Sequence, residues 1–278
     1  MDLSAFSKEN YERIKAVESS FGASGSPLSK PGRILIGRGR LMKRGRRKPQ
    51  PKAFFLFNDL LVYGSIIVNG RWHKKMKIIP LEDIQMEDME DGMEMKNQWL
   101  IRTPCKSFFV SAATVEEKQA WIEHIKDSRL SLLQGGSLRP SSSFAVTWIP
   151  DQAAHKCMRC FKNFTPTKRR HHCRKCGFLV CRSCSKHRAV IEHIHPTKKL
   201  RVCRICNTNN KMDETSRLRG DSTGLESLED ERVAASSEEE EAEGIIEDFH
   251  RSNWLDSRTG TWGNEHIYDY PRPMHLQP

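Results

Sequence analysis

Apolar residues in the first half of the chain alternate with polar ones over short runs. The runs are 34–42, 54–58, 60–63, 66–68, 76–79, 99–103 and 108–111, and turn residues or charged residues separate them. Alternation with a period of two is typical of β-strands that are buried on one face. The pattern predicts six or seven antiparallel strands.

The pattern changes to helical spacing on either side of these strands. Residues 8–21 place Ile14, Val17 and Phe21 on one face of a short helix. Residues 114–133 form a longer helix that carries a central Trp121, and its capping box opens with Thr114 and closes three residues later with a glutamate. Six or seven strands closed by one C-terminal helix predict an α+β fold, an antiparallel barrel over residues 33–134 after an N-terminal helix and connector at 1–32.

Two stretches have neither period. Residues 135–147 are rich in Gly, Ser and Pro, and are predicted to be a flexible linker that spans roughly 20 Å. Residues 213–278 are rich in Ser and Glu, which predicts a disordered tail. That tail also holds Trp254, Trp262 and several other aromatic residues. Two interpretations of these aromatics stay open: the tail packs back weakly, or it carries a linear motif for a partner protein.

The charge is distributed unevenly. The 278 residues carry a net charge of +11. Residues 148–212 hold 16 Lys and Arg against 2 Asp and Glu, whereas residues 213–278 hold 6 against 17. Basic regions followed by an acidic tail suggest an anionic partner, either nucleic acid or an anionic membrane. No signal peptide is evident, and the apolar runs are too short to span a bilayer, so a cytosolic protein is expected.

Eight of the nine cysteines form four Cys-x-x-Cys pairs. Such pairs bind tetrahedral zinc, and clustering in one part of the chain favours metal over disulfides. The gap between Cys176 and Cys181 is too short for the second and third pairs to share an ion. A cross-braced arrangement with two Zn²⁺ is therefore predicted: Cys157, Cys160, Cys181 and Cys184 bind one ion, and Cys173, Cys176, Cys203 and Cys206 bind the other.

Both predicted zinc sites are closed, all-thiolate and hence structural. The sequence contains no pattern typical of a nucleophile with its base, a phosphate-binding glycine loop or an open metal site. No enzymatic activity is therefore predicted.

The strand-rich part of the chain resembles a pleckstrin-homology domain. The run from Phe54 to Tyr63 is similar to the second and third strands of that family, and Trp121 matches its helix tryptophan. In this family the first hairpin is the phosphoinositide-binding loop. The resemblance implies a tentative lipid site here at Lys43, Arg46, Arg47, Lys48 and Lys52.

The cysteine-rich part resembles a FYVE zinc finger over 148–212. The matching motifs are Trp148-Ile149-Pro150-Asp151, the run from Arg169 to Gly177, and Arg201-Val202-Cys203. The family binds phosphatidylinositol 3-phosphate with these motifs.

The resemblance implies a role for each matching residue. Trp148 belongs to the pocket motif. Arg170, His172 and Arg174 would bind the 3-phosphate, and Arg169 the other phosphate. His171 and Asp151 would read inositol hydroxyls, and Arg201 would close the phosphate side. The membrane-contact loop would be Pro166, Thr167 and Lys168, which lack the large aliphatic pair of strongly inserting relatives.

The order of the two modules resembles the Phafin family over residues 14–206. This resemblance implies a phosphoinositide-binding adaptor, cytosolic and peripheral on early endosomes or lysosomes, that regulates endocytic, lysosomal or autophagic traffic. Two other functions stay open: a RING-like zinc-dependent ubiquitin ligase and an RNA-binding zinc module. The latter lacks the interleaved aromatics expected for base stacking, so no nucleic acid is expected.

Overall fold

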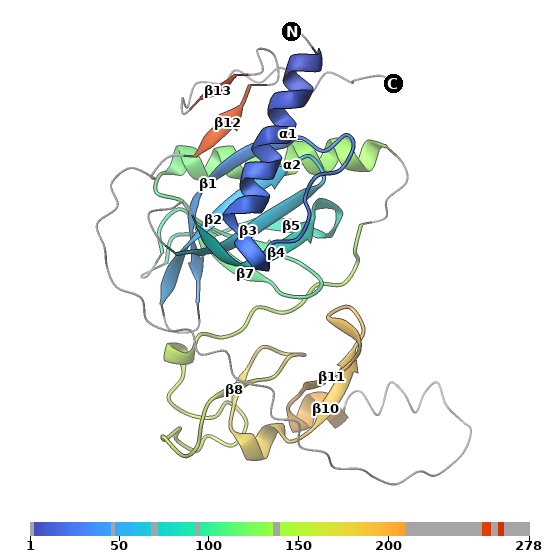
Figure 1. The fold of residues 1–278 in the computed structure, drawn as a ribbon. Coiled ribbons are helices and arrows are strands. Elements are labelled where there is room, and N and C mark those ends of the chain that lie inside the picture. Colours follow the sequence, from blue (N-terminus) through green and yellow to red (C-terminus); the bar gives the residue numbers. More distant parts are fainter. Residues whose placement is uncertain are drawn as a thin grey trace, which may run out of the picture.

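The computed structural model describes residues 3–45, 48–67, 72–92, 95–135, 140–208, 252–256 and 261–263. They form a β-rich domain and a smaller cysteine-rich domain. Figure 1 shows the β-rich domain above the cysteine-rich one. Among the described residues, no helix combines the length and the apolar character needed to cross a bilayer.

The β-rich domain is an antiparallel sheet with one helix after its last core strand. Its order is β4-β3-β2-β1-β7-β6-β5. The strands are β1 (Leu35–Arg44), β2 (Pro49–Phe57), β3 (Leu60–Ile66), β4 (His73–Pro80), β5 (Gln85–Asp88), β6 (Gln98–Arg102) and β7 (Phe108–Ser111), and the helix is α2 (Val115–Gln134). Short 3₁₀ turns follow the first helix at Gly22–Ser24 and β4 at Leu81–Asp83.

The sequence predicted most of these elements and missed one. The strand predicted at 66–68 does not begin at Ile66, which ends β3, and residue 68 lies outside the described part of the chain. β5 was not predicted, since Gln85, Glu87 and Asp88 interrupt the apolar alternation. Its strand character comes from pairing with β6, where Met86 lies opposite Ile101.

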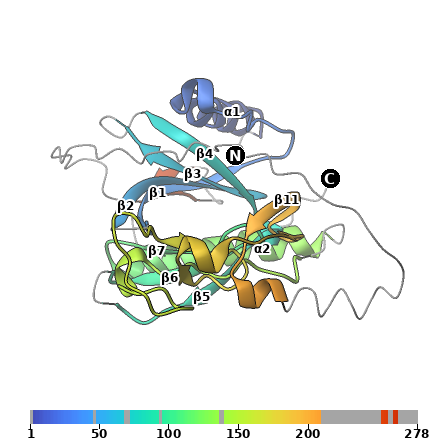
Figure 2. The same ribbon diagram turned by 90° about the horizontal axis from the view of Figure 1, so that it is seen from below.

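Strand β2 is buried on both faces. Phe54 and Leu56 join the core beneath α2, whereas Phe55 and Phe57 join a second cluster under α1 (Leu3–Ser20). Figure 2 shows α1 covering one face of the β1–β4 strands. The N-terminal helix is therefore part of the domain and begins five residues before the predicted start, at Leu3.

Helix α2 begins as the capping pattern predicted. The Thr114 side chain accepts a hydrogen bond from the Glu117 backbone N–H at 3.2 Å. The Glu117 carboxylate accepts one from the Ala113 N–H at 3.0 Å. The first interaction satisfies a backbone donor that the first helical turn leaves without an intrahelical partner, and the second binds the N–H of the residue just before the cap.

The segment that joins the two domains is docked over its second half, and the prediction of a flexible coil is wrong there. The backbone N–H of Ala145 donates to the Thr103 carbonyl at 3.0 Å, and the Ser107 hydroxyl donates to the Ala145 carbonyl at 2.5 Å. Ala145 is buried, and the Ser141 hydroxyl donates to the Asp83 carboxylate. Residues 136–139 lie outside the described part of the chain.

The cysteine-rich domain has little regular structure. It contains the 3₁₀ turns Asp151–Ala153 and Arg182–Ser185, the hairpin β8 (His171–His172) with β9 (Leu179–Val180), and the hairpin β10 (Arg188–Ile191) with β11 (His195–Arg201). Residues 204–208 are helical. The buried cysteines, Val180, Ile191 and Val202 form its core.

Part of the tail is ordered, which corrects the prediction of disorder for these residues. β12 (Asn253–Leu255) pairs with β1, and β13 (Trp262–Gly263) pairs with β12. Trp254 is 5% exposed and belongs to the core beneath α2. The interpretation in which the aromatic tail packs back is therefore confirmed for this segment, while the remainder of 213–278 lies outside the described residues.

Candidate functional site

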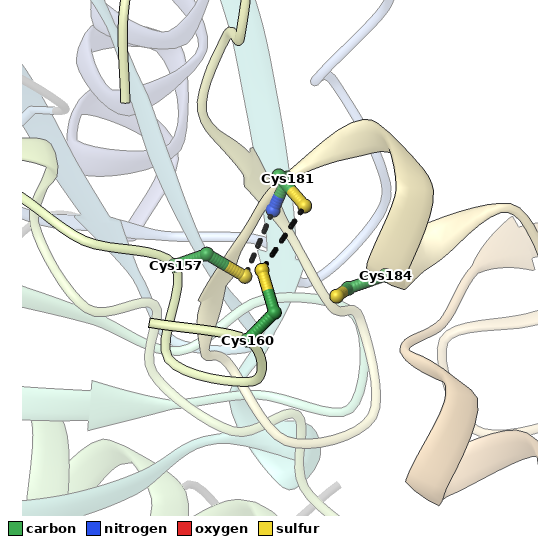
Figure 3. A group of neighbouring side chains, drawn as sticks. All are labelled: Cys157, Cys160, Cys181 and Cys184. Atoms are coloured by element: carbon green, nitrogen blue, oxygen red, sulfur yellow. Dashed lines mark hydrogen bonds between the residues drawn. The ribbon is translucent and has the colours of Figure 1, made fainter. Parts of the chain in front are cut away.

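The eight paired cysteines gather into two groups of four. One contains Cys157, Cys160, Cys181 and Cys184, and the other contains Cys173, Cys176, Cys203 and Cys206. In each group the sulfurs lie within 4.8 Å of one another, and Figure 3 shows the first group around a common point. The cross-braced pairing read from the spacing is the pairing in the structure.

The sulfur positions fit zinc. Tetrahedral Zn–S bonds of about 2.3 Å place neighbouring sulfurs about 3.8 Å apart. The Cys160 and Cys181 sulfurs are 3.8 Å apart, and those of Cys176 and Cys203 are 4.0 Å apart. The two quartets are positioned to bind two zinc ions, and all four ligand positions of each are thiolates. These ions would be structural.

Backbone hydrogen bonds within each quartet support the sulfurs. The Cys181 and Cys203 backbone N–H groups donate to the sulfurs of Cys157 and Cys173 at 3.3 and 3.2 Å. A hydrogen bond from Cys176, together with backbone donors, lowers the pKa of the Cys173 thiol to about 4. A thiolate that accepts N–H groups is stabilised in the form that binds metal.

Arg159 connects the two zinc sites. It follows the ligand Cys157 by two residues, yet its guanidinium donates to the sulfurs of the other quartet, Cys176 and Cys203, both at 3.3 Å. Its charge compensates thiolates whose own metal ion leaves them with excess negative charge. The sequence does not predict this role of Arg159, because nothing in its position along the chain indicates contact with the second quartet.

An aromatic stack beside the second quartet joins three predicted pocket residues. The Trp148 ring stacks on His172 with centroids 5.0 Å apart and an interplanar angle of 18°. The Arg174 guanidinium lies 3.9 Å from the Trp148 ring centroid, and its Nη1 donates to the His172 carbonyl at 3.0 Å. Cation–π contact and hydrogen bonding together hold Arg174 in one orientation.

Asp151 lies at the same place. Its Oδ1 is 3.6 Å from His172 Nε2, which is itself 2.8 Å from the Ile149 carbonyl oxygen. Since a carbonyl oxygen only accepts, Nε2 carries the proton in that contact. Asp151 Oδ1 is buried with no hydrogen-bond partner, although the side chain as a whole is 28% exposed. The buried oxygen therefore lies beside His172, while the rest of the side chain reaches solvent.

The close approach of the first motif to the second zinc site requires a glycine. Gly177 has a φ of +74°, and a Cβ there would lie 2.3 Å from the Thr147 carbonyl oxygen. The Ile149 N–H donates to the Gly177 carbonyl at 3.1 Å. Gly177 thereby allows the segment that carries Trp148 and Asp151 to lie against the hairpin that carries His172.

The other predicted pocket residues lie at the edge of this group or outside it. Arg169 and Arg170 are exposed, and the Arg170 guanidinium lies 4.9 Å from the Phe164 ring centroid. His171 is half-buried in β8. Arg201 donates to the Ser185 carbonyl at 2.8 Å and to its hydroxyl at 3.2 Å, so its guanidinium is held at the edge of the finger.

The predicted membrane-contact loop is a tight exposed turn. The Thr165 N–H donates to the Lys168 carbonyl at 3.3 Å, and the Lys168 N–H donates to the Thr165 hydroxyl at 3.0 Å. Pro166, Thr167 and Lys168 are exposed. Phe161, which the sequence analysis passed over, is 74% exposed and is the most exposed large apolar residue described in the finger.

The tentative basic site in the β1–β2 hairpin is not assembled as a pocket among its described members. Lys43 is 8% exposed, and its ammonium lies 4.3 Å from the Phe108 ring centroid. Lys52 donates to the Ser65 hydroxyl at 2.8 Å and to the Gln50 side chain at 3.2 Å. Lys48 is exposed, and Arg46 and Arg47 lie outside the described residues.

The stack around Trp148 also receives a residue from the β-rich domain. The Lys106 ammonium, in the turn between β6 and β7, lies 5.0 Å from the Trp148 ring centroid. The docked residues around Ala145 bring the two domains together here. Sequence reasoning did not identify Lys106, since only the tertiary structure places it beside Trp148.

The fold and the site define a class of protein: a pleckstrin-homology domain followed by a FYVE finger. Two family models match in that order, the PH domain over residues 35–129 and the FYVE zinc finger over residues 147–212.

Relatives match over most of the chain. Pleckstrin homology domain-containing family F member 1 from Homo sapiens is 48% identical over 207 residues, which is 74% of this chain and 74% of that protein. Family F member 2 from Mus musculus is also 48% identical, over 74% of this chain and 83% of that protein. A solved structure, the LM5-1 FYVE domain from Leishmania major, is 36% identical and covers 32% of this chain and 96% of that one, with a TM-score of 0.24.

The chain therefore belongs to pleckstrin homology domain-containing family F, the Phafin family. Its members are non-enzymatic, and the two domains make this chain a phosphoinositide-binding adaptor of endosomal membranes.

Proposed function

We propose that the site around Trp148 binds the head group of phosphatidylinositol 3-phosphate. The observation that carries the proposal is the assembly, at one zinc-supported hairpin, of a fixed cationic donor beside a partly exposed carboxylate. The cations suit phosphate, and Asp151 suits the hydroxyls of the inositol ring. A surface that bound only a polyanion would gain nothing from that carboxylate.

The donors match the charge and shape of a phosphomonoester. Such a group carries about −1.5 to −2 charges at neutral pH and presents three acceptor oxygens. Arg174 is held by Trp148 with its charge intact, and Arg170 and Arg169 lie exposed on the approach to β8. Guanidinium groups bind phosphate oxygens in pairs, so a small rigid set of arginines gives both affinity and orientation.

The proposed assignments keep the family roles where the geometry supports them. Arg170, His172 and Arg174 bind the 3-phosphate, Arg169 meets the other phosphate, and Asp151 with His171 reads the ring hydroxyls. His172 also orients the pocket, since it is 4% exposed between Trp148 and the Ile149 carbonyl. Arg201 reaches a phosphate only by leaving Ser185, so its contribution is expected to be smaller.

Membrane contact follows from the exposed turn. Pro166, Thr167 and Lys168 would meet the head-group region, with each basic residue near the surface contributing about 1 kcal/mol. The β1–β2 hairpin, with Lys48, Arg46 and Arg47, would give a second contact. Linking two weak sites in one chain raises avidity by about 10²–10⁴.

In the cell, this binding would recruit the protein from a cytosolic pool to early endosomes. There it would act as an adaptor in endocytic traffic, and more specifically in lysosomal or autophagic traffic. Protein partners would bind surfaces other than the zinc finger pocket.

A vesicle panel tests the proposal. Full-length protein is mixed with vesicles that contain phosphatidylinositol, its 3-phosphate, its 4-phosphate or its 4,5-bisphosphate. We expect selective binding to the 3-phosphate, and a loss of at least about tenfold in Arg170→Ala, because a charge-assisted phosphate contact is worth about 1.5–3 kcal/mol. Arg204→Ala, which removes another exposed arginine of the same finger, is the matched control.

Two outcomes would reject the proposal. Equal binding to all phosphorylated lipids would mean that the basic surface reads charge alone. Binding to RNA that the soluble 3-phosphate head group does not displace, or self-ubiquitination by the full-length protein, would favour one of the alternative functions.

A further inference from the structure

The tail strand β12 occupies a built site on the PH domain. It pairs antiparallel with the first half of β1, with Trp254 opposite Gly37 and Asn253 opposite Arg38. The second half of β1 pairs instead with β7. The tail strand therefore fills the edge of β1 next to helix α2 (Figure 1).

A buried serine makes the polar contact. Ser252 is 6% exposed, and its hydroxyl accepts a hydrogen bond from the indole N–H of Trp121 at 2.9 Å. The same hydroxyl donates to the carboxylate of Glu117, which is 4% exposed. A single hydroxyl both accepts and donates here, which an alanine could not do and a larger side chain would have no space to do.

The space around this serine is set by a glycine on β1. A Cβ at Gly39 would lie 2.2 Å from the Ser252 hydroxyl oxygen and 3.0 Å from its Cβ. Any side chain at residue 39 would therefore occupy the space that the Ser252 side chain fills. Gly39 and Glu117 therefore form a small polar pocket on the PH domain.

A second pocket receives the tryptophan two residues later. The Trp254 ring stacks on His124 of α2 with centroids 3.7 Å apart and an interplanar angle of 13°. It meets Trp121 edge to face at 4.7 Å. A Cβ at Gly37 would lie 2.2 Å from Trp254 Cζ3, so the glycine leaves room for the ring.

The two pockets are spaced for an extended peptide. Residues i and i+2 of a strand point to the same side, and Ser252 and Trp254 both face α2 in this way. Peptides that add a strand to a sheet edge gain affinity from main-chain hydrogen bonds and specificity from pockets for alternate side chains.

We propose that the edge of β1 beside α2 is a binding site for extended Ser-x-Trp peptides, and that the chain's own Ser252–Leu255 segment is its occupant. Glu117 and Trp121 hydrogen-bond the serine, for which Gly39 leaves space. His124 stacks on the tryptophan, for which Gly37 leaves space. The segment is a tethered ligand, separated from the zinc finger by residues 213–251, and this site is distinct from both lipid-contact regions.

Binding in trans tests the site. A fluorescent peptide of residues 249–264 is titrated into wild-type protein and into the full-length variant Ser252→Ala/Trp254→Ala, whose own segment lacks both anchors. We expect the variant to bind the peptide at least about tenfold more tightly than wild type, since tethering gives the native segment a millimolar effective concentration. A peptide that carries Trp254→Ala is expected to bind neither protein.

A second arm does not depend on the folding of that variant. A protease site is inserted in residues 213–243 of the otherwise native chain and cut after purification. The C-terminal piece is expected to stay with the rest during size exclusion, and to be released when Gly37→Val and Gly39→Val fill the pockets. Tyr270→Ala, in the same tail but outside the proposed anchors, is expected to change neither result.

Release of the C-terminal piece from the cut native protein would overturn the proposal. Equal binding of the wild-type and Trp254→Ala peptides would overturn the assigned specificity. A concentration-dependent dimer of the intact chain that Trp254→Ala abolishes would assign the strand to a second copy and reject the intramolecular assignment.

Discussion

The PH domain and the FYVE finger are stabilised by different interactions. In the PH domain, large apolar side chains from β2, α1 and α2 form two clusters, and Trp99, Trp121, Phe54 and Phe57 are fully buried. In the finger, the buried core consists mainly of the cysteines, with few apolar residues such as Val180 and Val202. One domain depends on apolar burial, and the other depends on metal.

This difference determines where each domain carries exposed charge. The metal ions fix the backbone of the finger, so the residues between the cysteines are free to be arginine and histidine. In the PH domain the strands bury apolar residues in these two clusters, and charged residues lie at the exposed positions of strands such as β4 and in turns. The finger therefore presents its basic residues on a small rigid hairpin.

Removal of zinc is expected to give the largest difference in stability between the two domains. Structural zinc contributes about 10–16 kcal/mol to the folding of such modules. A chelator should unfold the finger while the PH domain stays folded. Hydrogen exchange of the full-length protein measures this directly: amides at 171–206 should lose protection, and amides in β2 and β6 should keep it.

The control is the same experiment after zinc is restored. Return of protection in the finger is expected. Simultaneous loss of protection in both domains would contradict the division, as would a finger that stays protected without metal.

The next largest effect is expected from the tail. Trp254→Ala should lower the free energy of unfolding of the PH domain by about 3–5 kcal/mol, because it leaves a cavity beside Trp121 and His124. Denaturant titration of the full-length protein measures it. Trp72→Ala is the matched control, since Trp72 is 56% exposed; its cost should stay within about 0.5 kcal/mol. Equal costs would mean that β12 contributes little to the domain.

Acid should weaken the PH domain through two histidines. Burial lowers the pKa of His73 and of His124 from the ordinary 6.5 to about 4. Between pH 6.5 and pH 4 these histidines take up protons in the unfolded chain but not in the folded one. The free energy of unfolding therefore has its full value above about pH 6.5 and falls as the pH is lowered toward 4. The loss is up to about 3 kcal/mol for each histidine.

Chemical denaturation at a series of pH values checks this effect. The variant His73→Phe/His124→Phe should show a shallower fall over the same interval. An unchanged slope would show that other groups govern the acid sensitivity of the domain.

The smallest effect is expected at the contact between the domains. Lys106→Ala removes a cation–π contact with Trp148 worth about 0.5–1 kcal/mol. Affinity for vesicles that contain phosphatidylinositol 3-phosphate should fall about two- to fivefold. The affinity of Lys106→Met, which keeps a long side chain without the charge, should fall equally, and the affinity of Lys106→Arg should not fall. Full affinity in the methionine variant would indicate that Lys106 acts through packing alone, and a loss in the arginine variant would contradict a role for its charge.

The sequence predicted those features that depend on spacing along the chain. The cross-braced zinc sites follow from the short gap between Cys176 and Cys181, and the start of α2 follows from the capping pair. Alternation predicted the strands with one apolar face, but it missed β5, whose residues between Gln85 and Asp88 are mostly polar.

The features it missed depend on contacts between distant residues. Lys106 contacts Trp148, and Arg159 donates to sulfurs of the other quartet. The β12 segment packs on Gly37 and Gly39, more than two hundred residues earlier in the chain. A glycine in a strand does not indicate which side chain will occupy the space above it. The order of the tail therefore emerged only from the structure.

Vesicle flotation of the full-length protein distinguishes lipid binding by the finger from lipid binding by the PH domain. Full-length wild type, Arg170→Ala and Arg46→Ala/Arg47→Ala/Lys48→Ala are compared on vesicles with and without phosphatidylinositol 3-phosphate. If the residues between the zinc ligands bind the lipid, Arg170→Ala loses most of the 3-phosphate-dependent binding and the hairpin variant loses a smaller part. Full binding by Arg170→Ala together with a large loss in the hairpin variant would contradict lipid binding by the finger.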